Sequence, residues 1–171
     1  KMVVELLLSD MPEKTYKPDS ELAYWAGKLG VTDSRFEARE QPPCDESHPA
    51  MSVNLDACIQ CNRCVRACRE EQGNDVIGYA FRGSDSKIVF DQDDPMGAST
   101  CVACGECVQA CPTGALMPAT LVDQDNKRVA YPDKQVNSVC PYCGVGCQLT
   151  YNVKDDKLLY VTGRNGPANE N

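Results

Sequence analysis

The sequence is poor in aromatic residues, in basic residues and in histidine, of which it has only one. Phe, Trp and Tyr make up 6% of its 171 residues, too few to build an extensive apolar core. Lys and Arg number 17 against 25 Asp and Glu, and the net charge of −8 argues against nucleic acid or anionic lipid as partners. Long hydrophobic runs are also missing. We therefore expect no membrane span, which needs about 18 consecutive apolar residues.

Cysteine, in contrast, is abundant, with 12 residues. So many thiols beside so few large apolar side chains indicate that cross-links or bound metal supply part of the stability. All of them but Cys44 fall in three short runs, which random disulfide placement would not produce. No secretory signal is visible, because Glu5 interrupts the short apolar run at the start and no small-residue cleavage site follows it.

Residues 1–49 are expected to form a helical lead and a linker. The first apolar residues can form one or two helical turns. A second helix is predicted over 20–29, because Ser20 is a favourable N-cap and Gly30 a favourable residue after the last turn. Its apolar spacing places Trp25 on the face that packs against a neighbour. We expect this helix to pack and to carry no chemistry.

Residues 50–120 contain an internal repeat and are expected to form one domain. Laying Cys58 on Cys101 aligns the two copies, and all four cysteines of a C-x2-C-x2-C-x3-C pattern then coincide. Between the copies, the apolar residues of 76–90 predict a β-hairpin that turns at 83–86.

This spacing is that of the bacterial [4Fe–4S] ferredoxins. Three thiolates on a tight loop can hold three corners of one cubic cluster, while the fourth, on the following helical turn, points the other way. Where two copies occur, each fourth cysteine ligates the cluster of the partner copy. The predicted ligands are Cys58, Cys61, Cys64 and Cys111 for the first cluster, and Cys101, Cys104, Cys107 and Cys68 for the second.

The two copies differ around these cysteines. Small residues such as Ala103 in the second copy allow backbone N–H groups to turn toward cluster sulfur. Pro112 follows the last cysteine of the second copy, whereas Arg69 takes that place in the first, so the local turns are expected to differ. Arg63 and Arg66 lie beside ligands of the first copy. Their positive charge would raise the reduction potential of the first cluster above that of the second.

Zinc and disulfides are the alternatives to iron–sulfur clusters. Zinc is usually bound by two C-x2-C pairs or by mixed Cys and His with a longer gap, which two tandem four-cysteine runs in register do not offer. We therefore favour clusters over a zinc-organised structural domain. Metal analysis separates the two, because clusters bring iron, acid-labile sulfide and a brown colour, whereas zinc is colourless.

A third domain is expected over 136–171, where alternating apolar residues predict another hairpin. It starts with a C-x2-C-x3-C run formed by Cys140, Cys143 and Cys147. Three thiolates leave a [4Fe–4S] cluster one ligand short. Either Cys44 or His48 supplies the fourth ligand, or the ligand lies beyond the chain end because the sequence is a piece of a longer protein. We favour the second explanation. The chain also opens on Lys rather than on Met, as expected for a fragment of something longer.

These motifs carry a resemblance to a known family. The sequence Cys-Pro-Tyr-Cys-Gly-Val-Gly-Cys over 140–147 resembles the amino-terminal cluster motif of formate dehydrogenases in the molybdenum/tungsten bis-pterin oxidoreductase family. The ferredoxin motifs over 55–68 and 101–116 are similar to the two-cluster insert of soluble NAD-dependent formate dehydrogenase catalytic subunits. They also resemble [FeFe] hydrogenases and the large electron-relay subunit of respiratory complex I. Because the ferredoxin motifs occur here together with the motif of 140–147, the chain resembles the formate dehydrogenases more than these other proteins.

The resemblance implies an intramolecular electron relay. Formate would be oxidised to CO2 at a molybdenum or tungsten bis-pterin guanine dinucleotide in the remainder of the catalytic subunit. The electrons would pass through two [4Fe–4S] clusters in 50–120 and a third at 140–147, toward a flavin/NAD-binding subunit in the cytoplasm. The family pattern places the missing cysteine a few residues after Asn171. No catalytic or pterin-binding residue is expected within this chain.

The expected fold class is α+β: a short helical lead-in, a two-cluster [4Fe–4S] ferredoxin-like module, and a small β-rich [4Fe–4S] domain that is truncated. Two other functions remain open. The chain could be a free-standing polyferredoxin-type electron carrier, or the relay region of a related hydrogenase or complex I-like subunit.

Overall fold

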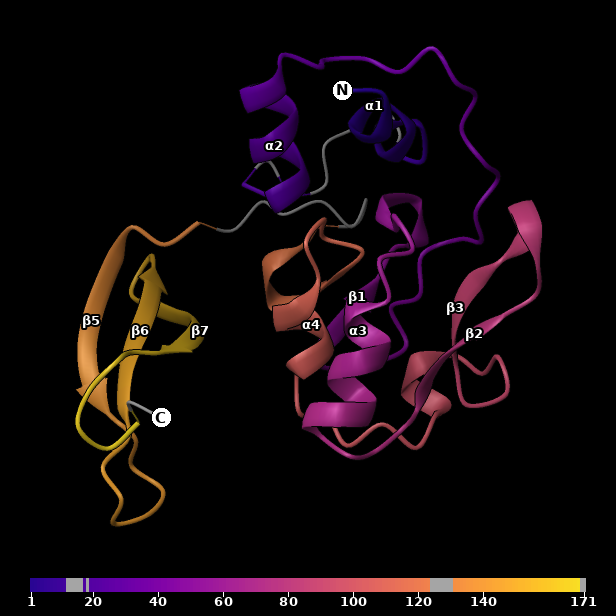
Figure 1. Ribbon diagram of the computed structural model, residues 1–171. Helices are drawn as coiled ribbons and strands as arrows, with labels where there is room; N and C mark the ends of the chain where they lie inside the picture. Colours follow the sequence, from indigo (N-terminus) through magenta and orange to yellow (C-terminus); the bar gives the residue numbers. More distant parts are fainter. Residues whose placement is uncertain (12–16, 18, 124–130, 170–171) are drawn as a thin grey trace. The chain divides into compact units, whose positions relative to one another are not determined.

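The computed structural model describes residues 1–11, 17, 19–123 and 131–169. The chain divides into two compact units, Lys1–Arg128 and Val129–Asn171 (Figure 1). Within the described residues, no helix is both long and apolar enough to cross a membrane.

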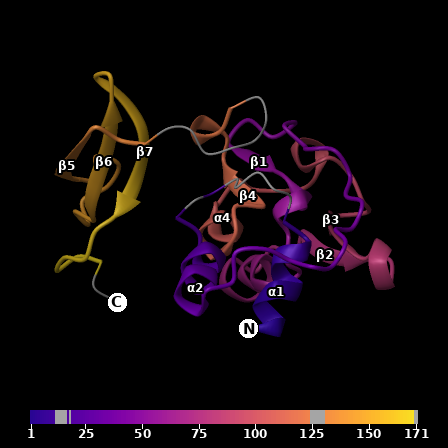
Figure 2. The same cartoon turned by 90° about the horizontal axis from the view of Figure 1, so that it is seen from above.

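The first unit opens with two helices that pack on each other, α1 (Met2–Ser9) and α2 (Glu21–Leu29) (Figures 1 and 2). The boundaries of α2 agree with the sequence to within one residue. The Ser20 side chain accepts a hydrogen bond from the Ala23 amide, as an N-cap does. Gly30 ends the helix with φ +62°, a left-handed conformation that glycine adopts without strain.

The buried face of α2 is the expected one, but Trp25 is less buried than the sequence predicts. Leu22 and Ala26 are buried, whereas Trp25 keeps 47% of its surface exposed. The indole lies at the edge of the contact, edge-on to the Tyr24 ring and below the Lys28 ammonium, which is 4.9 Å from its centroid. Trp25 also lines a hollow with Val4 and Leu7 of α1, so it lies beside the neighbouring helix but is only half buried.

The repeat folds into two short helices, α3 (Arg63–Arg66) and α4 (Glu106–Ala110), which pack against each other. Each helix follows a loop that carries the first two cysteines of its copy, and the third cysteine, Cys64 or Cys107, is the second residue of the helix. Strand β1 (Met51–Val53), ahead of the first copy, pairs antiparallel with β4 (Leu116–Pro118), behind the second copy. This pairing joins the two ends of the repeat and was not predicted from the sequence.

The hairpin between the copies forms as predicted. It consists of β2 (Ile77–Ala80) and β3 (Lys87–Phe90), connected through the helical turn Gly83–Asp85. Its apolar side chains join those of the two copies in one core. The residues of that core are Met51, Val53, Leu55, Val65, Cys68, Val76, Ile77, Ile88, Phe90, Met96, Cys107 and Leu116.

The two copies differ after their last cysteine, as Pro112 and Arg69 predict. In the first copy the chain continues as a π-helical turn, Ala67–Glu71, which contains Cys68. In the second copy α4 ends and Cys111 adopts an extended conformation with ψ 117°. A residue before proline is disfavoured in the helical region, and the proline ring excludes the next helical hydrogen bond.

The second unit is an antiparallel sheet in the order β5 (Lys134–Val139), β6 (Gln148–Lys154) and β7 (Lys157–Gly163). The β6–β7 hairpin is the predicted one. It turns at Asp155 and Asp156, which have φ of +49° and +59°, as a tight hairpin turn requires. Strand β5 was not predicted, because its exposed and mostly polar residues carry a weak strand signal.

A close backbone approach at Gly97 connects the linker to the core of the first unit. Gly97 lies in the helical turn Met96–Ala98, and Met96 is 1% exposed. The Gly97 amide donates to Ser47 Oγ at 2.8 Å, and a Cβ at Gly97 would overlap the backbone carbonyl of Ser47.

We therefore expect Gly97→Ala to lower the free energy of unfolding by about 1–3 kcal/mol, the usual cost of overpacking. The matched control is Gly27→Ala in α2, where a Cβ meets open space; it should gain up to about 1 kcal/mol from helix propensity. Denaturant unfolding of the cluster-loaded protein measures both. Equal stability of Gly97→Ala and the wild type would contradict the predicted clash.

Candidate metal centres

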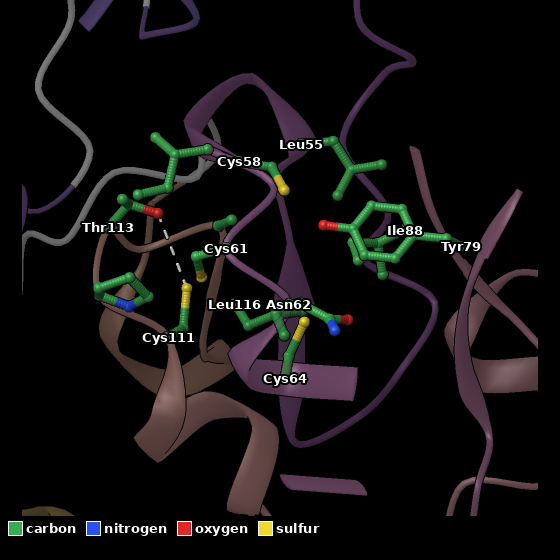
Figure 3. Close-up of a pocket in the computed structure, with 13 residues that line it drawn as sticks. Leu55, Cys58, Cys61, Asn62, Cys64, Tyr79, Ile88, Cys111, Thr113 and Leu116 are labelled. Atoms are coloured by element: carbon green, nitrogen blue, oxygen red, sulfur yellow. Dashed lines mark hydrogen bonds between the residues drawn. The ribbon is translucent and has the colours of Figure 1, made fainter. Parts of the chain in front are cut away.

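A pocket in the first unit gathers cysteines from both copies of the repeat (Figure 3). We call it the first pocket. Its four cysteines are Cys58, Cys61, Cys64 and Cys111. Most of the remaining lining is apolar, from Leu55, Ile59, Ile88, Pro112, Ala115 and Leu116. A cysteine of the second copy thus lies among three of the first.

The second pocket has the complementary composition. Its four cysteines are Cys68, Cys101, Cys104 and Cys107. All eight cysteines of the repeat therefore lie around two pockets in two sets of four, with one member of each set contributed by the other copy.

The cysteine loops have the same unusual backbone in both copies. Gln60 and Ala103 occupy equivalent positions and have φ of +54° and +58°, a left-handed conformation that is uncommon outside glycine. The Ala103 amide donates to the sulfur of Cys101 at 3.4 Å. The Gln60 amide makes the corresponding hydrogen bond to Cys58. A small residue is therefore not required to turn this N–H group toward sulfur.

Burial governs the protonation of the pocket thiols. It raises the pKa of Cys58 to about 11, and the neighbouring Cys111 and Cys61 add to the rise. Burial likewise raises the pKa of Cys107 to about 12, with further increases from Cys101 and Cys104. At neutral pH these thiols keep their protons unless a cation displaces them.

The donor set fits an iron–sulfur cluster. Four convergent sulfur atoms are the ligands that these clusters use, and most of the other residues around them are apolar. Iron would supply the positive charge that keeps the buried thiols ionised. The residues that would hold one cluster in each pocket are the two sets of four cysteines given above.

Two further residues of the first pocket were not singled out from the sequence. The Tyr79 ring lies beside Cys58 and Cys64, and burial, together with these cysteines, raises its pKa to about 12. The Thr113 hydroxyl lies 3.8 Å from the sulfur of Cys111. Thr113 could have been noticed two residues after a predicted ligand. Tyr79 gave no signal, because only the tertiary fold brings its strand to the cysteine loop.

The arginines of the first copy are paired with carboxylates. Arg63 lies 2.8 Å from Glu21 of α2, and Arg66 forms a two-pronged pair with Glu70 one helical turn away. Each partner is about half exposed or more, so solvent screens these charges further. Neutralised and screened in this way, the two arginines give no basis for a raised potential at the first cluster.

The third cysteine run forms the loop between β5 and β6. The Cys140 amide donates to the Cys147 carbonyl oxygen at 2.8 Å, which closes the loop. Cys143 is exposed, and the other two cysteines are half-buried. These three are the only cysteines of residues 131–169, and that range has no histidine.

Cys44 and His48 both belong to the first unit. Cys44 is exposed. His48 is buried, and its Nδ1 accepts a hydrogen bond from the Ala50 amide at 3.1 Å. One ring nitrogen of His48 therefore already has a local structural partner.

The crossed arrangement can be tested with paired substitutions. In the full-length protein, Cys58→Ala and Cys111→Ala should each remove about four iron atoms, the content of one cluster. Because both thiols line the first pocket, the double variant should lose no more iron than either single variant. Cys101→Ala combined with Cys111→Ala should instead lose both clusters. Iron and acid-labile sulfide per chain are the measurements. The opposite pattern of additivity would mean that each copy binds its own cluster.

Two protein families match separate parts of the chain. Residues 57–115 match a family described as "4Fe-4S dicluster domain". Residues 133–171 match the "Molybdopterin oxidoreductase Fe4S4 domain". The first match covers both pockets, and the second covers the sheet with the third cysteine run.

Similar proteins span several oxidoreductases. A "Putative formate dehydrogenase" of Staphylococcus haemolyticus is 28% identical over 89% of this chain and 19% of its own length. A subunit of an NADH-quinone oxidoreductase of Rhizobium meliloti is 34% identical over 84% of this chain and 16% of its own length. This chain thus spans at most about a fifth of these relatives.

Among solved structures, an NAD+-reducing [NiFe]-hydrogenase in the H2-reduced state is 27% identical with a TM-score of 0.59. The match covers 68% of this chain and 52% of the hydrogenase chain.

The order of the two matched domains and the names of the relatives confirm the resemblance drawn from the sequence. The chain is an iron–sulfur region in which a 4Fe-4S dicluster domain precedes a molybdopterin oxidoreductase Fe4S4 domain, and it is similar to part of the formate dehydrogenase-like proteins.

Proposed function

We propose that this region is the intramolecular electron relay of a formate dehydrogenase catalytic subunit. The observation that carries the proposal is the gathering of eight cysteines around two pockets, in a chain that continues into a molybdopterin oxidoreductase Fe4S4 domain. When bound, [4Fe–4S] clusters would accept and release single electrons at potentials that the surrounding protein sets.

The residues of the chain have three tasks in this proposal. The two sets of cysteines hold the clusters, and crossing ties both clusters to the same pair of helices. The backbone amides of Gln60 and Ala103 direct partial positive charge toward sulfur, which favours the reduced state. Apolar side chains such as Leu55 and Ile88 line the first pocket beside the cysteines and would lower the polarity around a cluster.

The rest of the proposal concerns the whole protein. Cys140, Cys143 and Cys147 would hold a third cluster, completed by a ligand outside the described residues. The remainder of the catalytic subunit would carry a molybdenum or tungsten bis-pterin guanine dinucleotide, where formate becomes CO2. Electrons would leave toward a flavin/NAD-binding subunit in the cytoplasm. Two observations support this part of the proposal: the staphylococcal relatives are named putative formate dehydrogenases, and the chain is similar to an NAD+-reducing hydrogenase.

The test uses the complete enzyme complex. Formate, added without oxygen, should reduce the clusters of the wild type, as seen by EPR, and should drive reduction of NAD+. Cys111→Ala should abolish NAD+ reduction, because it breaks the relay, while a dye that accepts electrons at the pterin site should still be reduced. Cys44→Ala is the matched control, since Cys44 lies outside both sets, and should keep both activities. Wild-type clusters that formate cannot reduce would refute the proposal.

A second candidate function is the relay region of an NADH-quinone oxidoreductase-like protein. The observation that favours it is the 34% identity to the oxidoreductase subunit of Rhizobium meliloti. In that case NADH, and not formate, would reduce the clusters of the isolated complex. The same EPR experiment therefore separates the two functions.

A further inference from the structure

Tyr79 presents its hydroxyl group to the cysteines of the first pocket. The residue lies on β2, and its ring forms part of the pocket lining. Figure 3 shows the phenol oxygen pointing toward the sulfur atoms of Cys58 and Cys64. The residue is 41% exposed, so its side chain is only partly buried.

The hydrogen of this hydroxyl is available for donation. The backbone amide of Asn62 hydrogen-bonds the phenol oxygen, which therefore acts as an acceptor toward the cysteine loop. A tyrosine hydroxyl accepts through its lone pairs and donates its single hydrogen separately. The negative charges that the hydroxyl would face are those of the Cys58, Cys64 and Cys61 thiolates.

Thr113 supplies a second hydroxyl from the opposite copy of the repeat. Its side chain is 1% exposed, and its Oγ1 lies 3.8 Å from the sulfur of Cys111 (Figure 3). A ligating thiolate has no hydrogen, so in the loaded protein the threonine is the donor of this pair.

The second pocket differs in this respect. None of the described residues that line it carries a hydroxyl group. Its polar side chain, Asn74, donates to the Thr100 carbonyl oxygen at 3.4 Å. The backbone N–H···S contacts occur in both copies, so they do not distinguish the two sites.

We propose that Tyr79 and Thr113 donate O–H···S hydrogen bonds at the first pocket and make its cluster the more easily reduced of the pair. Reduction adds negative charge, which hydrogen-bond donors stabilise more strongly than they stabilise the oxidised state. The first cluster would therefore have the higher reduction potential, as the sequence predicted from Arg63 and Arg66, but the cause would be the two hydroxyl groups. An electron shared by the two sites then resides mainly at the first. This inference rests on the proposed cluster-binding function.

The test measures the reduction potential of each cluster by EPR-monitored redox titration of the full-length subunit. Tyr79→Phe and Thr113→Val remove only a hydroxyl each. Each should lower the equilibrium constant for reducing the first cluster about tenfold, which corresponds to about 59 mV for one electron, and leave the second cluster unchanged. The signals are assigned from Cys58→Ala and Cys101→Ala, which remove one cluster each.

Tyr24→Phe is the matched control, because Tyr24 lies on α2 with 62% of its surface exposed and outside both pockets. It should leave both potentials unchanged. A second readout is pulsed EPR, in which comparison of samples in H2O and D2O identifies exchangeable protons coupled to the first cluster. The coupling of the Tyr79 hydroxyl proton should be missing in Tyr79→Phe.

The outcomes separate the two proposals. Intact clusters with unchanged first-cluster potentials in both Tyr79→Phe and Thr113→Val would overturn the hydrogen-bond inference alone. A uniform shift of both clusters would overturn it as well, since it would indicate a general structural effect. Wild-type protein without iron and acid-labile sulfide would refute the proposed function, and the inference with it.

Discussion

The structure depends on one constraint: four thiols, one of them from the opposite copy of the repeat, must converge on each pocket. Crossing requires that α3 and α4 lie side by side, so that Cys68 and Cys111 each reach the loop of the other copy. The β1–β4 pairing fulfils this requirement by joining the two ends of the repeat. The apolar core contains Cys68 and Cys107 and packs against further ligand cysteines. The cysteine pockets and the core are therefore one structural unit.

Without metal, the buried cysteines of the two pockets are difficult to ionise. Desolvation and mutual repulsion raise the pKa of Cys58 and Cys107 to about 11 and 12. A chain with few aromatic residues has little apolar burial to compensate for such pockets. If clusters bind as proposed, cation binding and folding would be coupled, because iron would replace the thiol protons and hold distant segments together.

The repeat produces two similar sites with different surroundings. Backbone conformation is shared, as Gln60 and Ala103 show, because it follows from the cysteine spacing. The surrounding side chains are not shared, and residues from outside the repeated motif supply the difference. Glu21 of the helical lead pairs with Arg63, and Tyr79 of the intervening hairpin reaches the first pocket. Part of the electrostatic distinction between the sites thus arises from elements that the repeat does not contain.

The sequence by itself determined the local elements and the chemistry of the sites. Ser20 and Gly30 bounded α2, alternation marked the β2–β3 and β6–β7 hairpins, and cysteine spacing defined two crossed sets of four. These signals are short-range, so each can be read without the rest of the chain. The tertiary structure alone decided the β1–β4 pairing, the exposure of Trp25 and the approach of Tyr79 to the cysteines. Those features depend on which distant segments of the chain come into contact. Such contacts are not encoded in a pattern of neighbouring residues, so they cannot be read from a local stretch of sequence.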